Sequence, residues 1–285
     1  MQKIRLNVFD ETLRDGEQQV GIFFDPQIKL DLANLITATG VQKIALMPAI
    51  HNTEAELLTK LIKQGSPQTF AASTMMAPQY IDQAVACGVK HIILFHAVSD
   101  RLLWLRDSTY KITNQSQEQS SATLNPAQDP VVIAKICQAM QAKVITNCEY
   151  AVSRGLKVSF AAEDASRANL AFLADCIYKF QPYLDNFLLC DTVGILNPVT
   201  TTRWIKQLRE LTQDQLPLMV HFHNDHGLAL ENTIQAIVAG AKGISGTFGG
   251  IGERAGNVAL DQVLNGLKLR YGWQVEGIDL SLIHI

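Results

Sequence analysis

Short apolar runs alternate with longer amphipathic stretches along almost the whole chain. The runs are rich in Val, Ile and Phe, which is typical of buried strands, and they predict strands at 4–9, 43–47, 69–73, 91–95, 157–161, 187–190, 218–222 and 243–248. Between them the apolar positions recur with a helical period, which predicts helices at 26–39, 53–63, 78–88, 130–154, 168–180, 198–211, 228–239 and 258–269.

Strict alternation of strands and helices predicts a parallel sheet with helices outside it. Eight such units in 285 residues favour a closed α/β barrel, the (β/α)8 TIM barrel. We expect residues 1–272 to form this barrel as the catalytic domain, and residues 273–285 to form a truncated or atypical tail. An open doubly wound sheet is the alternative, but no G-x-G-x-x-G follows the first strand.

One stretch interrupts the pattern. Residues 100–129 end in the polar run NQSQEQSSATLNPAQD, which is too polar to pack and predicts a solvated surface insertion near 112–128.

Composition excludes several classes of protein. With 47% hydrophobic and 18% charged residues the chain can build a large core, and a net charge of −3 argues against a sequence-independent nucleic-acid footprint. Five cysteines without a C-x-x-C spacing resemble reduced thiols of an intracellular protein. No signal-peptide pattern opens the chain and no long apolar run indicates a membrane span, so we expect a cytoplasmic protein.

In a TIM barrel, function belongs to the carboxyl ends of the strands. Polar residues concentrate at those positions of this chain: Arg14, Asp15, Gln18, Ser99, Asp100, Glu163, Asp164, Arg167, Asp191, Thr192, His221, His223, Asn224, Asp225, Glu253, Arg254 and Asn257. Their gathering on one rim is harder to attribute to chance than any single motif.

The strongest local signal is His221-Phe222-His223. Residues i and i+2 of a strand point to the same face, so both imidazoles project together. Two imidazoles and a carboxylate suit a divalent cation such as Mn, Zn or Mg. Closure of the barrel between the last and first strands would bring Asp15 close, so we predict Asp15, His221 and His223 as ligands, with Asn257 as a candidate fourth. A hydrogen-bonded polar cluster without metal is the alternative.

Four glycines precede the last helix in the segment GGIGERAGN, 249–257. Glycine-rich backbone that leads into a helix after the final barrel strands is a common site for anionic groups. The segment could receive a carboxylate or a phosphate, or its glycines could only permit tight turns.

Five spaced segments resemble the DRE-TIM metallolyases, which include 2-isopropylmalate, homocitrate and citramalate synthases and hydroxymethylglutaryl-CoA lyase. The segments are FDETLRDGEQ (9–18), VSFAAEDASRANLAFL (158–173), LCDTVGILNP (189–198), HFHNDHGLALENT (221–233) and GIGERAGNVALDQV (250–263). The resemblance spans essentially the whole chain and is closest to the homocitrate synthase branch, although isopropylmalate synthases are similar there.

The resemblance implies an acyltransferase of amino-acid biosynthesis that condenses acetyl-CoA with a 2-oxo acid and then hydrolyses the thioester, giving a 2-alkylmalate-type product. It implies that a metal on Asp15, His221 and His223, with Asn257 nearby, polarises the carbonyl of the 2-oxo acid. Arg14 would stabilise the enolate or alkoxide oxygen.

The resemblance also implies roles for other rim residues. Thr192 would bind the carboxylate of the 2-oxo acid, Gln18 would line the acyl site, and Glu163 would assist proton transfer. Arg167 is a candidate for a distal carboxylate, and Ser99 is a further candidate substrate-binding residue.

Several departures from the family pattern are visible. The second strand commonly ends with a glutamate in this family, but here Ala45 replaces it, which removes an acidic neighbour expected near Arg14. Met75 and Met76 follow the third strand in place of a basic residue, and the insertion near 112–128 is unusual. Synthases of the family also continue into a smaller domain, so the chain could be a fragment.

Three functions therefore remain open: the acyltransferase, a lyase that runs in the cleavage direction, and a non-catalytic homologue that binds or assembles. The cysteine that hydroxymethylglutaryl-CoA lyases carry in the last glycine-rich loop is absent from 249–257. The resemblance favours the acyltransferase, acting as a homodimer, as is common in the family.

Overall fold

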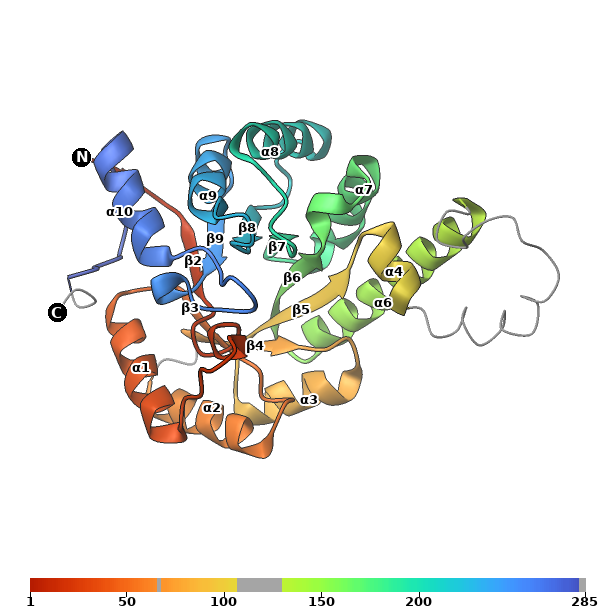
Figure 1. Ribbon diagram of the computed structural model, residues 1–285. Coiled ribbons are helices and arrows are strands. Elements are labelled where there is room, and N and C mark those ends of the chain that lie inside the picture. Colours follow the sequence, from red (N-terminus) through yellow and green to blue (C-terminus); the bar gives the residue numbers. More distant parts are fainter. Residues whose placement is uncertain (66–67, 107–129, 282–285) are drawn as a thin grey trace.

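Eight parallel strands close into a barrel in the computed structural model, which describes residues 1–65, 68–106 and 130–281 (Figure 1). In barrel order they are β2 (Asn7–Asp10), β3 (Lys43–Leu46), β4 (Phe70–Thr74), β5 (His91–Ala97), β6 (Lys157–Glu163), β7 (Asn186–Asp191), β8 (Leu218–Phe222) and β9 (Gly243–Gly246). The predicted TIM barrel is confirmed. The polar insertion predicted near 112–128 lies outside the described residues.

Helices surround the ring of strands (Figure 1). They are α1 (Pro26–Ala38), α2 (Asn52–Gln64), α3 (Pro78–Cys87), α4 (Asp100–Arg106), α6 (Pro130–Ser153), α7 (Leu170–Phe180), α8 (Pro198–Thr212), α9 (Ala229–Val238) and α10 (Leu260–Tyr271). Short 3-10 turns are η1 (Gly16–Gln18), η3 (Ala165–Arg167), η4 (Gln181–Tyr183) and η5 (Phe248–Gly250). Within the described residues, no helix has the length and apolar character needed to cross a bilayer.

Helix boundaries follow ordinary capping chemistry. α1, α3 and α8 begin with proline, whose fixed φ suits the first helical position. Asp25 and Asn197 accept backbone N–H groups at the starts of α1 and α8. α3 ends at Gly88, which has a left-handed backbone.

One local prediction was wrong, and one helix was missed. The run 4–9 was expected to be one strand, but it divides into β1 (Gln2–Ile4) and β2, and β1 pairs with β10 (Trp273–Val275) outside the barrel. The division falls at Arg5, whose side chain is exposed and pairs with Glu276 beyond β10. The helix α4 was not predicted, because no helix was assigned between the strand at 91–95 and the insertion near 112–128.

The hydrophobic interior has two parts. A large core lies between the strands and the helices, and a small one fills the barrel. The small core consists of Phe9, Ala45, Ala71, Ile93, Leu188, Cys190 and Met219. Because side chains alternate along a strand, a residue two positions after an inward-facing one also points into the barrel. Inward-facing core residues thus lie two positions before residues of the site described below: Phe9 before Glu11, Leu188 before Cys190, and Met219 before His221.

Barrel closure between β2 and β9 sets the position of the loop after β2. Asp10 is in register with Gly246, and the backbone N–H of Glu11 donates to the carbonyl of Gly246. The buried Lys29 of α1 then holds the loop from outside, with its Nζ 2.5 Å from carboxylate oxygens of both Glu17 and Glu54. The segment that carries Arg14 and Asp15 is thus fixed at both ends.

Asp10 ties this loop to the loop after β9. Its carboxylate accepts hydrogen bonds from the backbone N–H and the hydroxyl of Thr12, and the Thr12 hydroxyl oxygen accepts from the N–H of Phe248. Burial raises the pKa of Asp10 to about 7, against the lowering effect of the Thr12 hydrogen bonds.

The elevated pKa of Asp10 predicts a pH-dependent stability that Asp10→Asn removes. The folded chain binds the Asp10 proton more tightly than the unfolded chain, so this stabilisation is complete below the unfolded pKa and is lost as the pH rises through about 7. The free energy of unfolding falls by at most about 1.4 kcal/mol per pH unit over that window. In urea titrations of both proteins from about pH 5 to about pH 8, the free energy of unfolding of Asp10→Asn should rise relative to that of the wild type as the pH increases. The exposed Asp31→Asn is the matched control. If the difference in free energy of unfolding from the wild type did not change with pH for either variant, the raised pKa of Asp10 would be contradicted.

Candidate active site

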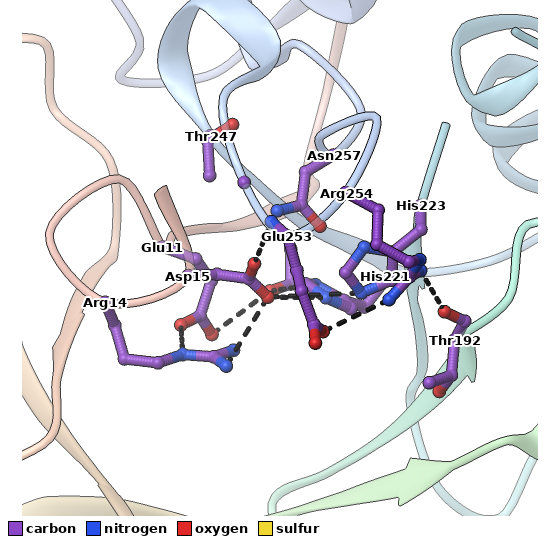
Figure 2. Close-up of polar contacts among 12 residues, drawn as sticks. Glu11, Arg14, Asp15, Thr192, His221, His223, Thr247, Glu253, Arg254 and Asn257 are labelled. Carbon is purple, nitrogen blue, oxygen red and sulfur yellow. Dashed lines mark hydrogen bonds and ion pairs between the residues drawn. The ribbon is translucent and has the colours of Figure 1, made fainter. Parts of the chain in front are cut away.

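Asp15, His221 and His223 meet at the carboxyl ends of the strands (Figure 2). Asp15 precedes η1 in the loop after β2, His221 lies in β8, and His223 follows that strand. Asp15 Oδ2 is 3.4 Å from His221 Nε2 and 4.0 Å from His223 Nε2. One ligand atom from each residue lies within 4.8 Å of the other two, which is close enough for the three to share an ion.

Burial and neighbouring charges shift the pKa values of Asp15 and His223. All three are buried, with exposed fractions between 2% and 6%. Burial alone would raise the pKa of Asp15, but the Arg14 charge and the two histidines hold it well below its usual range, so the group is a carboxylate. Burial lowers the pKa of His223 to about 4, so its imidazole is neutral and keeps a lone pair for a metal at neutral pH.

Two polar atoms at this site have no protein partner. His223 Nδ1 and Asn257 Oδ1 are both buried without a hydrogen bond, and such atoms are uncommon unless water, an ion or a ligand satisfies them. Asn257 is held beside the histidine by a bridge to His223 and by donation from its Nδ2 to the carbonyl of Ile251. The donor set therefore fits a divalent cation, although no ion is part of the structure.

Gly252 shows how closely the last loop approaches the cluster. A Cβ at this position would lie 2.1 Å from Asn257 Nδ2 and 3.1 Å from Asp15 Oδ1, and its φ of +153° is rarely adopted by other residues. The next residue, Glu253, donates its backbone N–H to Asp15 Oδ1 at 3.2 Å. The glycine-rich segment thus packs against the carboxylate of Asp15.

Arg14 lies between two carboxylates. Its Nε donates to Glu11 Oε2 at 2.7 Å, and its Nη1 is 3.4 Å from Asp15 Oδ2. Glu11 is 1% exposed. Burial opposes the charge of Arg14, but Glu11 and Asp15 more than compensate and raise the pKa of the guanidinium. The permanently charged guanidinium of Arg14 therefore lies next to the carboxylate of Asp15.

A pocket of about 300 Å³ opens beside this cluster, within the size range of small-ligand sites. Its lining brings together most of the residues expected from the sequence with several that were not: Arg14, Asp15, Gln18, Met47, Phe95, Arg106, Ala161, Glu163, Cys190, Thr192, His221, His223 and Glu253. Ser99 and Arg167, expected to bind substrate, do not line it.

Ser99 and Arg167 both contact Asp164 instead. The hydroxyl of Ser99 donates to Asp164 Oδ2, and the Arg167 guanidinium binds both carboxylate oxygens at 2.7 and 2.8 Å. Asp164 has a left-handed backbone with φ +63°, and its N–H donates to Thr192 Oγ1 at 2.8 Å. The two residues therefore fix the loop after β6, which in turn orients Thr192.

Glu163 makes a bidentate ion pair across the pocket. Both of its carboxylate oxygens accept from the terminal nitrogens of Arg106, at 2.5 and 2.6 Å. Arg106 is the last described residue of α4, and nothing in its polar surroundings marked it as a site residue in the sequence. Glu163 thus faces the pocket with a cation already bound.

Arg254 joins three loops on the opposite side. Its guanidinium binds Asp225 at 2.7 and 2.9 Å and donates to the carbonyl of Thr192 (Figure 2). Its backbone is left-handed with φ +58°, a costly conformation for a side chain with a Cβ. The clamp fixes the loops after β7, β8 and β9 relative to one another.

Sequence reasoning gave no role to Glu11, Ser245 or Cys190. Strand alternation held the signal, because Glu11 follows the inward-facing Phe9 by two residues and Cys190 follows Leu188 in the same way. Ser245 is in register with both Phe9 and His221. Phe95 follows the inward-facing Ile93 in the same way, whereas Arg106 offered no comparable signal.

Comparison with known proteins gives concordant results. A model of the HMGL-like family matches residues 5–284. Homocitrate synthase AksA of Methanopyrus kandleri is 34% identical over 93% of this chain and 60% of its own length. 2-Isopropylmalate synthase 2 of Caldanaerobacter subterraneus is 30% identical over 96% of this chain and 64% of its own length.

A solved structure shares the fold. Hydroxymethylglutaryl-CoA lyase of Pseudomonas aeruginosa superposes with a TM-score of 0.71 at 19% identity, covering 99% of this chain and 90% of that one. The chain spans about 60% of the length of the homocitrate synthase relative.

Asp15→Asn and His223→Ala are each predicted to weaken binding of Mn²⁺ or Zn²⁺ at least about tenfold, because each removes a ligand from the three-residue set. Isothermal titration measures the affinity directly. His226→Ala is the matched control, since this exposed histidine follows β8 on the same loop but is outside the cluster. Unchanged affinity in either ligand variant would remove that residue from the site.

Proposed function

The chain belongs to the HMGL-like family, and on that premise we propose that its rim site catalyses a metal-dependent condensation of acetyl-CoA with a 2-oxo acid. The relatives named homocitrate synthase and 2-isopropylmalate synthase support this class of reaction. In the reaction the methyl carbon of acetyl-CoA bonds to the carbonyl carbon of the 2-oxo acid, and water then cleaves the thioester. The products are a 2-alkylmalate-type acid and free CoA.

One arrangement carries the proposal: a buried metal-ligand set and a permanent cation share one small pocket. Asp15, His221 and His223 would hold the metal, with Asn257 Oδ1 as an available fourth donor. A divalent ion bound there would act as a Lewis acid on the carbonyl of the 2-oxo acid. Arg14 would stand beside the oxygen on which negative charge develops, and its contacts to Glu11 and Asp15 keep it fixed there.

Thr192 is suited to bind a substrate carboxylate. Its hydroxyl oxygen accepts the N–H of Asp164, so the hydroxyl proton stays free to donate into the pocket. Arg254 holds its carbonyl and Asp164 holds its side chain, which leaves Thr192 preorganised. Gln18 lines the same pocket and would contact the acyl group.

Glu163 would move a proton, in the environment set by Arg106. Both carboxylate oxygens of Glu163 already accept hydrogen bonds from Arg106, so this ion pair competes with any role of Glu163 in proton transfer. Glu163 therefore acts as a base only when a substrate or a movement of α4 releases it. An anionic part of the substrate is the natural competitor for Arg106, because Arg106 and Arg14 are the two arginines that line the described pocket.

A thiol-release assay with acetyl-CoA and a panel of monocarboxylic and dicarboxylic 2-oxo acids tests the proposal. We expect release of CoA that requires both Mn²⁺ or Zn²⁺ and one of the 2-oxo acids, with a loss of about 10³-fold or more for Asp15→Asn. Glu231→Gln is the matched carboxylate control, because this residue lies on the outer surface in an ion pair with Arg270.

Other outcomes would contradict the proposal in distinct ways. Metal binding without thiol release, but with cleavage of a hydroxyacyl-CoA, would assign a lyase. Absence of metal binding would assign a non-catalytic homologue.

Glu163→Gln is predicted to lower kcat by about 10²-fold or more, the usual effect of removing a general acid or base. Metal affinity should stay unchanged, because Glu163 is not part of the ligand set. Arg106→Gln provides the comparison, since it removes the cation and leaves the carboxylate free. Full turnover by Glu163→Gln would assign the proton transfer to another group.

A further inference from the structure

We propose that Glu11 supplies, from the first barrel strand, the carboxylate that the family resemblance places on the second, and that it positions Arg14 and His221. The inference rests on the proposed function for its kinetic consequences. It makes Glu11 a positioning residue, since it reaches the reacting groups through two other side chains.

The two carboxylate oxygens of Glu11 contact different residues, Arg14 and Ser245. Its Oε2 accepts from Arg14 Nε at 2.7 Å, and its Oε1 is 3.3 Å from the hydroxyl oxygen of Ser245. The same hydroxyl oxygen lies 3.2 Å from His221 Nδ1. One buried carboxylate thus contacts Arg14 directly, as Figure 2 shows, and reaches His221 through Ser245.

The sheet register explains why this position can replace the missing glutamate. Asp10 of β2 pairs with Ile44 of β3, so one further step places Glu11 beside Ala45. Ala45 is fully buried in the small core inside the barrel, together with Phe9, the residue two positions before Glu11. The inward-facing side chains at positions 11 and 45 therefore point into the same volume inside the barrel. In this chain the small side chain, Ala45, is on β3, and the carboxylate, Glu11, follows β2.

The hydrogen-bond directions favour metal binding by His221. A serine hydroxyl has one proton, and Glu11 as a carboxylate can only accept, so the Ser245 proton goes to Glu11. His221 Nδ1 then donates to Ser245, which leaves the lone pair on Nε2, the nitrogen that faces Asp15. Such partners fix the tautomer and orientation of metal-binding histidines.

The charge balance leads to the same conclusion. Two described carboxylates, those of Glu11 and Asp15, are in ion-pair contact with Arg14. Without Glu11, Asp15 would be the remaining described carboxylate in ion-pair contact with Arg14, and the guanidinium would compete with a metal for it. Glu11 binds Nε of Arg14, so the negative charge of Asp15 is only partly neutralised by the guanidinium and remains available to a divalent cation.

The experiment uses Glu11→Gln, which keeps the shape and removes the charge. We expect the affinity for Mn²⁺, measured by isothermal titration, to fall about 10- to 100-fold, as is usual when a partner of a metal ligand is lost. In the condensation assay kcat should fall by a similar factor, while KM for acetyl-CoA changes little. Glu231→Gln is again the surface control, and the melting temperature of the metal-free protein reports on the fold.

A transplant separates positioning from simple support of the fold. In the double variant Glu11→Ala/Ala45→Glu the carboxylate moves to the neighbouring strand, and we expect Mn²⁺ affinity and kcat to recover at least about tenfold relative to Glu11→Ala. Recovery would support the proposal even if Glu11→Ala alone is unstable. A double variant that regains the wild-type melting temperature without regaining Mn²⁺ affinity would overturn it, as would Glu11→Gln with wild-type affinity and kcat.

The metal titration needs no turnover. If the wild-type chain binds Mn²⁺ but releases no thiol from any 2-oxo acid, the proposed condensation fails, and the affinities of the Glu11 variants still decide the role of Glu11.

Discussion

Pairing of β2 with β9 is the constraint on which the site depends. Asp15 and His221 are far apart in sequence, and they become neighbours because Asp10 is in register with Gly246 and Ser245 is in register with His221. Once the ring closes, the loop after β2 has little freedom, since Asp10 binds Thr12, Thr12 binds Phe248, and Lys29 holds Glu17 from outside. The backbone therefore determines the distances within the cluster of Asp15, His221 and His223.

Holding several ionisable groups in a buried space has an electrostatic cost, and the site distributes it over opposite charges. Arg14 outweighs the effect of burial and holds the pKa of Asp15 down, and Glu11 and Asp15 raise the pKa of the half-buried Arg14. On the far side of the pocket, Arg106 and Glu163 compensate each other in the same way. Groups that are preorganised with their charges balanced need little rearrangement during a reaction, which is the main source of electrostatic catalysis.

The sequence predicted the barrel well because the pattern is repeated and local. Each strand is a short apolar run and each helix has a regular apolar face, so small errors in one element leave the alternation intact. The failures lie where local pattern was ambiguous. The run at 4–9 is apolar enough for one strand, but its two parts have different partners, since β1 pairs with β10 outside the barrel and β2 pairs with β9 inside it.

The proximity of Asp15, His221 and His223 was also predictable, because the two histidines of HxH project from the same face of a strand and barrel closure brings the carboxylate beside them. The pairing of Arg106 with Glu163 was not, since it joins residues 57 positions apart through a helix that was not expected. Ser99 and Arg167 stand at the expected strand ends, but the unusual backbone of Asp164 draws both of them to its own carboxylate. A rim position therefore identifies candidates, and the loop conformation decides which of them face the pocket.

Glu11 and Ala45 show a limit of comparing motifs one position at a time. The absence of an expected glutamate at residue 45 indicated a weakened site, whereas the volume beside Arg14 does contain a buried carboxylate. Adjacent parallel strands present their inward side chains to the same space, so a charge can move from one strand to the next without a change in its partners. The physical requirement is a carboxylate within reach of the Arg14 guanidinium, and the register of β2 with β3 lets either strand provide it.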